Sequence, residues 1–492
     1  MPDDIAQPGS SHVENSPDAI PGVPRNPIEY AALERQLVRK VDWRLMPVLV
    51  LMIVLNYLDR NALPNARVQG IETDLGLKGD DYNVAISVLF AGYIALQIPS
   101  NMLPTRVRPS IYLPFCMALW GIVKDFRGLV ICRFSLGFLE APFFPGALFL
   151  LSSWYTPKEL ATRTAVLYTG SLLSGGFGGL VGAGVQYGLN NVHGLLSWKR
   201  LFILKGIITV GVSLLSIFIL VDFPSTTRGL ADQERAIAIH RLHRHSGTVD
   251  EAKGPILQGI KMAIVDYKVW LLTAIIITKT SAGAVTSFIP TLVATFKFSA
   301  VQWLLMVAPP YVFAAMVALA ISMSSDKHSE RYFHLVTPLV AGLAGYTIAA
   351  TSTALAPRYF SLFLMLGGVY GSYDISLAWM DFLAIPRPLE KRAAAFAIAN
   401  MVGNFAQIYS PYMYNANTGP RYLAAMVANS VFVFASICVA TVLRFCLVWE
   451  NQRLEAAEMA GREAEPDSKP GDVVQRGPGG VVRLRSGFRY TL

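Results

Sequence analysis

The chain has 492 residues, of which 53% are hydrophobic and only 15% are charged. Soluble domains carry roughly 25% charged residues, so this composition excludes an ordinary series of soluble domains. The formal net charge is +9. The basic residues, however, lie in short segments beside apolar blocks, which is the distribution that orients membrane proteins and does not indicate a nucleic-acid partner. The sequence therefore predicts a polytopic membrane protein in a lipid bilayer.

The polar start of the chain, residues 1–45, is expected to be a mostly disordered cytoplasmic segment. Its last part, "IEYAALERQLVRKVDWRL", has the pattern of a short amphipathic helix on the membrane surface. Apolar blocks of about the length that spans a bilayer follow. Their positions are 46–62, 83–103, 109–123, 128–153, 163–187, 201–221, 269–292, 303–323, 333–353, 359–384, 394–414 and 423–446.

These blocks predict an all-α fold of twelve transmembrane helices. Residues 46–221 would form one six-helix bundle and residues 269–446 the second, joined by a cytoplasmic loop, 222–268. The tail, 447–492, is also expected in the cytoplasm, with "PGDVVQRGPGGVVRLRSGF" disordered. Two such halves related by a pseudo-twofold axis are the plan of one large class of transporters.

The third block is unusually short. Within "ALWGIVKDFRGLV" the third helix ends after about 15 apolar residues, below the ~20 needed to span. Either the bilayer thins and the helix shifts to compensate, or the sequence reflects a misjudged splice junction.

The fourth block, "RFSLGFLEAPFFPGALFLLSSW", carries Arg133 and Glu140. A charge near the middle of a membrane helix costs about 2.5–3.5 kcal/mol, so it must face protein or water. The two residues are two helical turns apart on one face, and Gly137 between them leaves room for another helix. Glu140 could gain and lose a proton during transport, while Arg133 tunes the proton affinity of Glu140 or helps to hold an anionic substrate. Alternatively, the two form a static ion pair.

Two further charges lie deep in the second half. Lys279 in the seventh block is a candidate to attract a carboxylate substrate, or it pairs with Asp374 in the tenth. Asp374 is in turn a second candidate for proton coupling. Asp381, near the end of the tenth block, is expected to be a cap or gate contact. Lys205, near the outer end of the sixth block, is expected to reach the membrane surface by snorkelling.

Polar residues also lie along one face of the eleventh block and at the end of the first block. Asn400, Asn404 and Gln407 recur at i, i+4 and i+7, so they form a stripe that lines a pathway, bonds neighbouring helices, or both. The first block ends in a charge cluster at the predicted outer vestibule, either structural or gating, formed by Asp59, Arg60 and Arg67.

Other chemistry finds no support. "HRLHRH" (His240, His243, His245) lies in a basic loop without acidic or cysteine ligands, so no metal is expected. No Walker-type phosphate loop occurs, so ATP is not the expected energy source and no cofactor is predicted. The four cysteines lie inside apolar blocks, as small hydrophobic residues do. No reactive constellation indicates an enzyme.

Six stretches resemble the major facilitator superfamily and, more narrowly, the fungal allantoate permease family of anion:cation symporters. They are "NYLDRNALPNARV", "VLFAGYIALQIPSNMLPTRVRPS", "RFSLGFLEAPFFPGALFLLSSWYTPKELATRTA", "APPYVFA", "IPRPLEKRAAAFAIANMVGNFAQIYSPYMY" and "TGPRYLAAMVANSVFVFAS". The family pattern carries over at Asp59, Arg60, Arg133, Glu140, Asn400, Asn404 and Gln407. Lys205 departs from it, because relatives usually have Glu there.

The resemblance implies uptake of a small organic anion, such as a carboxylate or a vitamin, together with protons. We therefore expect a secondary active transporter with alternating access, acting as a monomer in the plasma membrane rather than the vacuole. Related genes also lie near fungal secondary-metabolite pathways, so an exporter of such a metabolite is the first alternative. A nutrient sensor that does not transport is the second.

Overall fold

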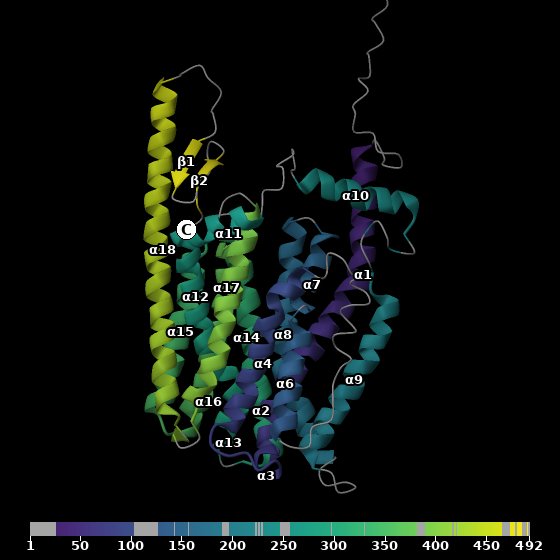
Figure 1. Cartoon of the computed structure of the whole chain (residues 1–492), viewed down its shortest axis with the longest axis vertical. Helices are drawn as coiled ribbons and strands as arrows, with labels where there is room; N and C mark the ends of the chain where they lie inside the picture. The colour runs from purple at the N-terminus through teal and green to yellow at the C-terminus, as the bar shows by residue number, and fades with distance from the viewer. Residues whose placement is uncertain are drawn as a thin grey trace, which may run out of the picture.

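The computed structural model describes residues 26–102, 126–141, 143–155, 157–188, 196–221, 224, 227, 230–246, 256–296, 298–328, 330–380, 389–415, 418–419, 421–464, 473–477, 480–484 and 490. Within these residues nearly all of the chain is helical, as Figure 1 shows. The first half contains α1 (Pro27–Arg60), α2 (Ala62–Val68), α3 (Ile71–Asp74), α4 (Asp81–Met102), α6 (Phe126–Glu140), α7 (Phe143–Ser152), α8 (Pro157–Gly188) and α9 (Ser197–Ile219).

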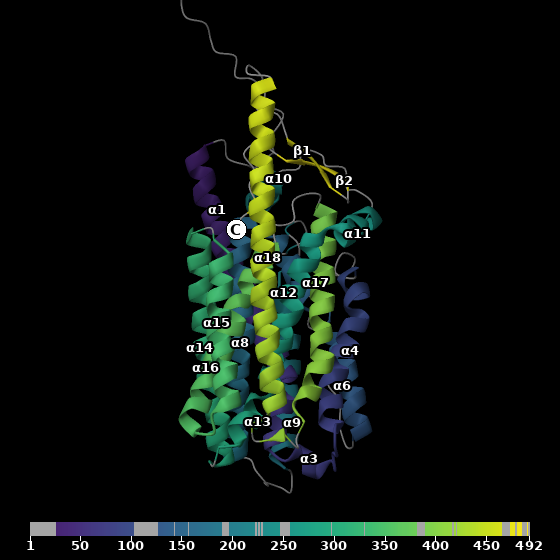
Figure 2. The same cartoon turned by 90° about the vertical axis from the view of Figure 1, so that its left-hand side faces the viewer.

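The second half follows two helices of the central loop, α10 (Asp232–Ser246) and α11 (Ile256–Val265). It contains α12 (Tyr267–Gly283), η3 (Ala284–Phe288), α13 (Ile289–Ala294), α14 (Ala300–His328), α15 (Tyr332–Thr351), α16 (Leu355–Met380), α17 (Leu389–Tyr409), η4 (Ser410–Met413) and α18 (Leu423–Ala464). Figures 1 and 2 show α10 and α11 at one end of the bundle, here called the loop face, and α3 and α13 at the other, here called the opposite face.

The long helices agree with the predicted apolar blocks. Among the described residues, seven helices are long and apolar enough to cross a membrane, namely those within α1, α8, α12, α14, α15, α16 and α18. Helices α4, α6 with α7, α9 and α17 overlap four further predicted blocks. The short third block, 109–123, lies outside the described residues.

The first predicted boundary is wrong. Helix α1 runs without interruption through residues 45 and 46, so the expected surface helix and the first membrane helix are one element. It begins where the Asn26 side chain caps the backbone N–H of Ile28. Its projecting start is held by α10, since Lys40 pairs with Glu234 at 2.8 Å. This partner is distant in sequence, and the local pattern did not reveal it.

The predicted tail also needs correction. Helix α18 continues past residue 446 to Ala464, and the stretch expected to be disordered contains an antiparallel pair, β1 (Val473–Gly477) and β2 (Gly480–Leu484). Valine pairs on both sides of a Gly/Pro-rich connection favour such a hairpin. Tyr490 then docks on α18, because its backbone N–H and carbonyl both bond the side chain of Asn451, at 2.7 and 2.9 Å.

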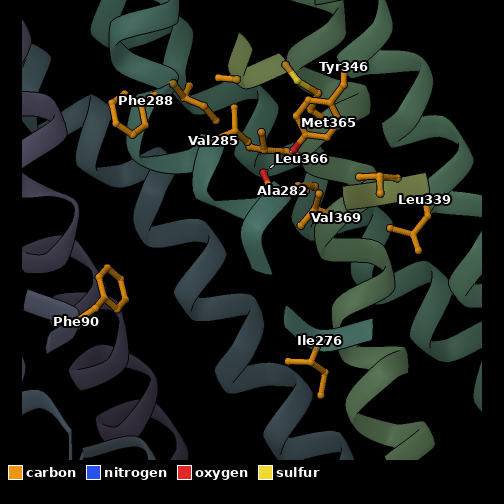
Figure 3. Close-up of a cluster of buried hydrophobic side chains, with 14 of the residues drawn as sticks. Phe90, Ile276, Ala282, Val285, Phe288, Leu339, Tyr346, Met365, Leu366 and Val369 are labelled. Atoms are coloured by element: carbon orange, nitrogen blue, oxygen red, sulfur yellow. Dashed lines mark hydrogen bonds between the residues drawn. The ribbon is translucent and has the colours of Figure 1, made fainter. Parts of the chain in front are cut away.

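A buried apolar cluster fixes the helices of the second half around α12. Figure 3 shows Tyr346 and Met365 packed beside η3 and the end of α12. The Tyr346 hydroxyl donates to the carbonyl oxygen of Ala282 at 2.7 Å, which satisfies its polar atom in an apolar setting. The end of α12 is therefore fixed against α15 and α16. This contact positions Lys279, which lies about one turn before Ala282 on α12.

Glycines set the spacing of α4 and α6. A Cβ at Gly137 would overlap the carbonyl oxygen of Leu89, and one at Gly92 would overlap that of Phe134. The expectation that Gly137 makes room for another helix is confirmed. This close approach brings Arg133 on α6 against α4.

The Gly137→Ala variant should therefore be destabilised by about 1–3 kcal/mol, the range found when a packed core is overfilled. Thermal unfolding of the purified protein in detergent measures the effect. Gly184→Ala is the matched control, since no atom lies within 4 Å of a Cβ at that position. Equal melting temperatures for the two variants would contradict the close α4–α6 contact.

The two halves contact each other through α8 with α14, α4 with α17, and α2 with α13. A Cβ at Gly179 on α8 would lie 2.5 Å from the carbonyl oxygen of Leu304 on α14, so these backbones are close. Ser87 on α4 donates to the carbonyl oxygen of Ile408 on α17 at 2.7 Å. These contacts lie toward the opposite face, where α13 joins α2.

Candidate functional site

A cavity of about 160 Å³ lies between the two halves and is lined by residues of both. The first half contributes α1, α2, α4, α6 and α8, and the second contributes α12, η3, α14, α16 and α17. Six of the predicted site residues line it: Arg60, Arg133, Lys279, Asp374, Asn404 and Gln407. The fold thus brings together residues that are more than 300 positions apart in the sequence.

Arg60 connects the cavity to Glu140. Its Nε and Nη2 both donate to Glu140 Oε2, at 3.1 and 2.8 Å. The Glu140 side chain is only 4% exposed and does not itself line the cavity. The rings of Tyr57, Phe90 and Tyr93 surround the guanidinium at 5.0–5.3 Å, an arrangement that favours a cation.

The alternative of a static ion pair between Arg133 and Glu140 is not observed among the described residues. Glu140 takes Arg60 as its partner, because the end of α1 approaches α6 where the carboxylate lies. Arg133 is buried and donates instead to the carbonyl oxygens of Ala85 and Arg60, at 3.3 and 3.4 Å. Its Nη1 is buried and has no hydrogen-bond partner in the part of the chain that the structure describes. A buried guanidinium nitrogen beside a cavity, without a partner, is suited to an anion.

Lys279 and Asp374 share the cavity but form no ion pair in the described structure. The Lys279 ammonium is fully buried and donates to the carbonyl oxygen of Ser372 at 3.1 Å and to the Ser376 hydroxyl. It also lies 4.7 Å from the ring centre of Tyr373. These neighbours on α16 satisfy the lysine, so the alternative of a direct Lys279–Asp374 pair is not observed. Both charges remain at the cavity wall.

The polar stripe of α17 lies partly at the cavity and partly in hydrogen bonds within and between helices. Asn404 and Gln407 line the cavity, and Gln407 Nε2 lies 3.5 Å from the carbonyl oxygen of Thr280 on α12. Asn400 is not among the lining residues. It accepts from Asn404 Nδ2 through its backbone and side-chain oxygens, at 2.9 and 3.2 Å, and so orients that amide.

The charge cluster at the end of the first block is divided by the fold. Asp59 is buried and accepts from the Thr209 hydroxyl at 3.1 Å. Lys205 is also buried, 4% exposed, and donates to the carbonyl oxygen of Leu58 at 2.9 Å. Its predicted snorkelling is wrong, because α9 packs on α1, and Leu58 of α1 supplies this acceptor. Asp59 thus faces α9 rather than a vestibule.

Arg67 lies apart from these residues, near the opposite face. It pairs with Glu72 at 2.9 Å and covers the ring of Tyr82 at 4.0 Å. Asp381, the predicted cap or gate contact, lies outside the described residues.

Sequence reasoning missed the aromatic wall of the cavity. This wall is formed by Tyr57, Phe90, Tyr168, Tyr311, Tyr370 and Tyr373. A signal was present in "NYLDR" and "VYGSYD", where Tyr57 precedes Arg60 by three residues and Tyr370 precedes Asp374 by four. Aromatic residues at such positions share the face of the charge, so they line the same space.

Of the residues that the structure describes, no histidine of the "HRLHRH" motif and no cysteine lines the cavity. Among the described residues, no group of His, Cys, Asp and Glu is arranged to hold a metal ion. His240 packs instead against Tyr30, with ring centres 5.6 Å apart. Cys132, Cys438 and Cys446 form no disulfide bond within the described part of the chain.

The family model described as Major Facilitator Superfamily matches residues 49–411. The chain belongs to this superfamily. Two similar superfamily members are the MFS-type transporter cnsO of Penicillium expansum, 30% identical over 87% of this chain and 86% of that protein, and the major facilitator-type transporter hxnP of Emericella nidulans, 30% identical over 87% and 88%. The superfamily part of the predicted resemblance is thereby confirmed.

Solved structures show the same superfamily fold. A bacterial homologue of the human lysosomal transporter Spinster, in an inward-facing and unoccupied conformation, has a TM-score of 0.64 at 16% identity, covering 84% of this chain and 97% of that one. The xylose transporter XylE of E. coli has a TM-score of 0.55 at 13% identity, covering 80% and 97%. The predicted superfamily fold is confirmed, and the chain is a multi-pass membrane transporter. The predicted count of twelve transmembrane helices stays a prediction, since seven spans are found among the described residues.

The Arg60→Ala variant should lose about 3–5 kcal/mol of stability, because it leaves the buried Glu140 carboxylate without its counter-charge. Adding Glu140→Gln should restore most of that loss, because the uncompensated charge is then removed. Thermal or denaturant unfolding of both variants in detergent tests this. A double variant no more stable than Arg60→Ala would contradict the pairing.

Proposed function

We propose that this superfamily member is a secondary active transporter that moves a small organic anion across a membrane together with protons. Its central cavity would open alternately to the two sides as the halves rock. The narrower assignment that we propose is the fungal allantoate permease family of anion:cation symporters, on the motifs quoted above.

The observation that carries the proposal is that Arg133 lines the cavity and that its guanidinium has a buried Nη1 with no hydrogen-bond partner among the described residues. Lys279 supplies a second cation from the opposite half. Of the acidic candidates, Glu140 is already paired with Arg60, while Asp374 lines the cavity. An anion bound at Arg133 would complete its hydrogen bonding and would contact both halves, so the cargo would favour their approach.

The proposed coupling uses the connection between Arg60 and Glu140. Arg60 lines the cavity and Glu140 lies behind it, so protonation of Glu140 would release Arg60 toward an anion in the cavity. Proton and anion would then bind cooperatively. A proton on Glu140 releases Arg60 for the anion, and an anion at Arg60 draws that arginine away from Glu140, so Glu140 binds a proton more readily. Asp374 is the second candidate for the proton, because its carboxylate also faces the cavity.

A screen of small carboxylates and vitamins for pH-dependent uptake, in cells expressing the chain, tests the function. We expect at least one anion whose uptake falls as the external pH rises. Net efflux of a cellular metabolite would instead indicate the secondary-metabolite exporter. Binding without flux in liposomes would indicate the nutrient sensor. A tagged chain in the same cells distinguishes plasma membrane from vacuole.

The Arg133→Gln variant should raise the KM for the transported anion about 10- to 100-fold, because a hydrogen bond to a charged group contributes about 1.5–3 kcal/mol. Initial uptake rates over a range of substrate concentrations measure this. Lys199→Gln is the control, since it removes a cation that pairs with Asp74 outside the cavity. An unchanged KM in Arg133→Gln would refute the anion site.

The Glu140→Gln variant should abolish accumulation driven by a proton gradient while leaving part of the exchange of labelled for unlabelled substrate. The amide no longer exchanges a proton, but the cavity still binds cargo. Proteoliposomes with an imposed pH gradient separate these two activities, and Asp374→Asn provides the comparison. Normal accumulation by Glu140→Gln at every external pH would exclude it as the coupling site.

A further inference from the structure

Two tyrosines from opposite halves meet at the cavity wall. Tyr168 on α8 and Tyr373 on α16 pack edge to face, with ring centres 5.8 Å apart and planes at 65°. Both rings line the cavity. Because the halves must move relative to each other during transport, a contact between them at this position cannot be preserved throughout the cycle.

The pair lies on the loop-face side of the cavity. Helix α8 begins near the loop face, where Glu159 pairs with Arg241 of α10. Along α8, Tyr168 therefore precedes the other residues that meet the second half, namely Leu172, Gly175 and Gly179. Helix α16 runs the other way, since Tyr359 near its start bonds Met306 near the start of α14. Tyr373 follows Tyr370 toward the loop face.

The contacts between the halves differ on the two sides of the cavity. Toward the opposite face, helix backbones approach closely, as Gly179 does with Leu304. There too, Phe288 contacts Tyr82 of the first half edge-on at 6.1 Å and stacks on Tyr414 at 4.1 Å. On the loop-face side, Tyr168 and Tyr373 meet through their side chains. Side chains can separate by changing rotamers, whereas packed backbones must move as whole helices.

We infer that Tyr168 and Tyr373 form a gate between the cavity and the loop face, and that Lys279 holds Tyr373 in the closed position. The Lys279 ammonium lies 4.7 Å from the centre of the Tyr373 ring and is tied to the backbone of the same helix at Ser372. On the other half, Phe144 supports Tyr168 with ring centres 5.0 Å apart. Each ring of the gate is therefore backed by its own half.

This arrangement links the gate to the contents of the cavity. Lys279 lines the cavity and contacts the Tyr373 ring at the same time. A cation over an aromatic face is attracted to it, and a negative charge entering the cavity competes for that cation. Bound anion would thus weaken the hold on Tyr373 and favour opening toward the loop face. The gate as such depends only on the chain being a transporter, which membership of the superfamily establishes. Only this link to Lys279 rests on the proposed anionic cargo.

The test uses a reporter thiol in the cavity and needs no knowledge of the substrate. Cys116, Cys132, Cys438 and Cys446 are replaced by serine, and Ser287, a lining residue, is replaced by cysteine. The full-length chain is placed in sealed vesicles of each orientation. The rate of modification by a membrane-impermeant methanethiosulfonate then reports access from each side.

Tyr168→Ala and Tyr373→Ala should each raise the modification rate severalfold from the loop-face side and leave the rate from the other side unchanged. Tyr168→Phe and Tyr373→Phe should stay near the parent, because the ring is retained. Phe363→Ala is the control on α16, since that ring packs on Phe313 within the second half. Unchanged loop-face rates in both alanine variants would overturn the gate. An equal rise from both sides would also overturn it, because it would indicate general loosening.

Lys279→Met should raise the loop-face rate as Tyr373→Ala does, and Lys279→Arg should stay close to the parent. If Lys279→Met is modified at the same rate as the parent, Lys279 does not hold the gate closed. Failure of the carboxylate uptake screen would leave the alanine result intact, so the gate and the proposed cargo are tested separately. Elution and melting temperature of each variant establish that it is folded before its rate is compared.

Discussion

The ion pair between Arg60 and Glu140 is the constraint around which the first half is arranged. A carboxylate that is 4% exposed inside an apolar bundle requires a counter-charge, and Arg60 supplies it with two hydrogen bonds to one oxygen. That pairing fixes the end of α1 against α6, and among the described residues Arg133 bonds backbone carbonyls. The unpartnered nitrogen of Arg133 follows from this choice of partner.

The packing between the halves explains how charged residues can lie at the centre of the molecule. Glycines on α8 let α14 approach, and the cavity remains beside this contact, where aromatic rings replace small residues. Tyrosine faces provide a wall that tolerates both a cation and an apolar group, as Arg60 among Tyr57, Phe90 and Tyr93 illustrates. The cavity is therefore polar at a few fixed points and apolar between them.

Much of the fold could be predicted because membrane helices obey a local rule. Block length and hydropathy located the long helices, and Gly137 was correctly expected at a close helix contact. Partner choice could not be predicted in the same way. Residues seven apart on one helix face, such as Arg133 and Glu140, are adjacent in a pattern, but a neighbouring helix can supply a better-placed partner. For the same reason the predicted position of Lys205 was wrong and the partner of Lys279 was left open. The acceptor of Lys205 belongs to α1, and those of Lys279 belong to α16.

The sequence by itself determined the membrane class, most of the helix positions, and which residues were too polar to face lipid. These properties follow from the composition of single segments, because hydrocarbon excludes unpaired charge whatever the neighbours are. Only the tertiary structure decided that Glu140 pairs with Arg60, that Arg133 keeps a free donor, and that Tyr168 meets Tyr373 across the cavity. Those outcomes depend on distances between helices, which no local pattern of residues encodes.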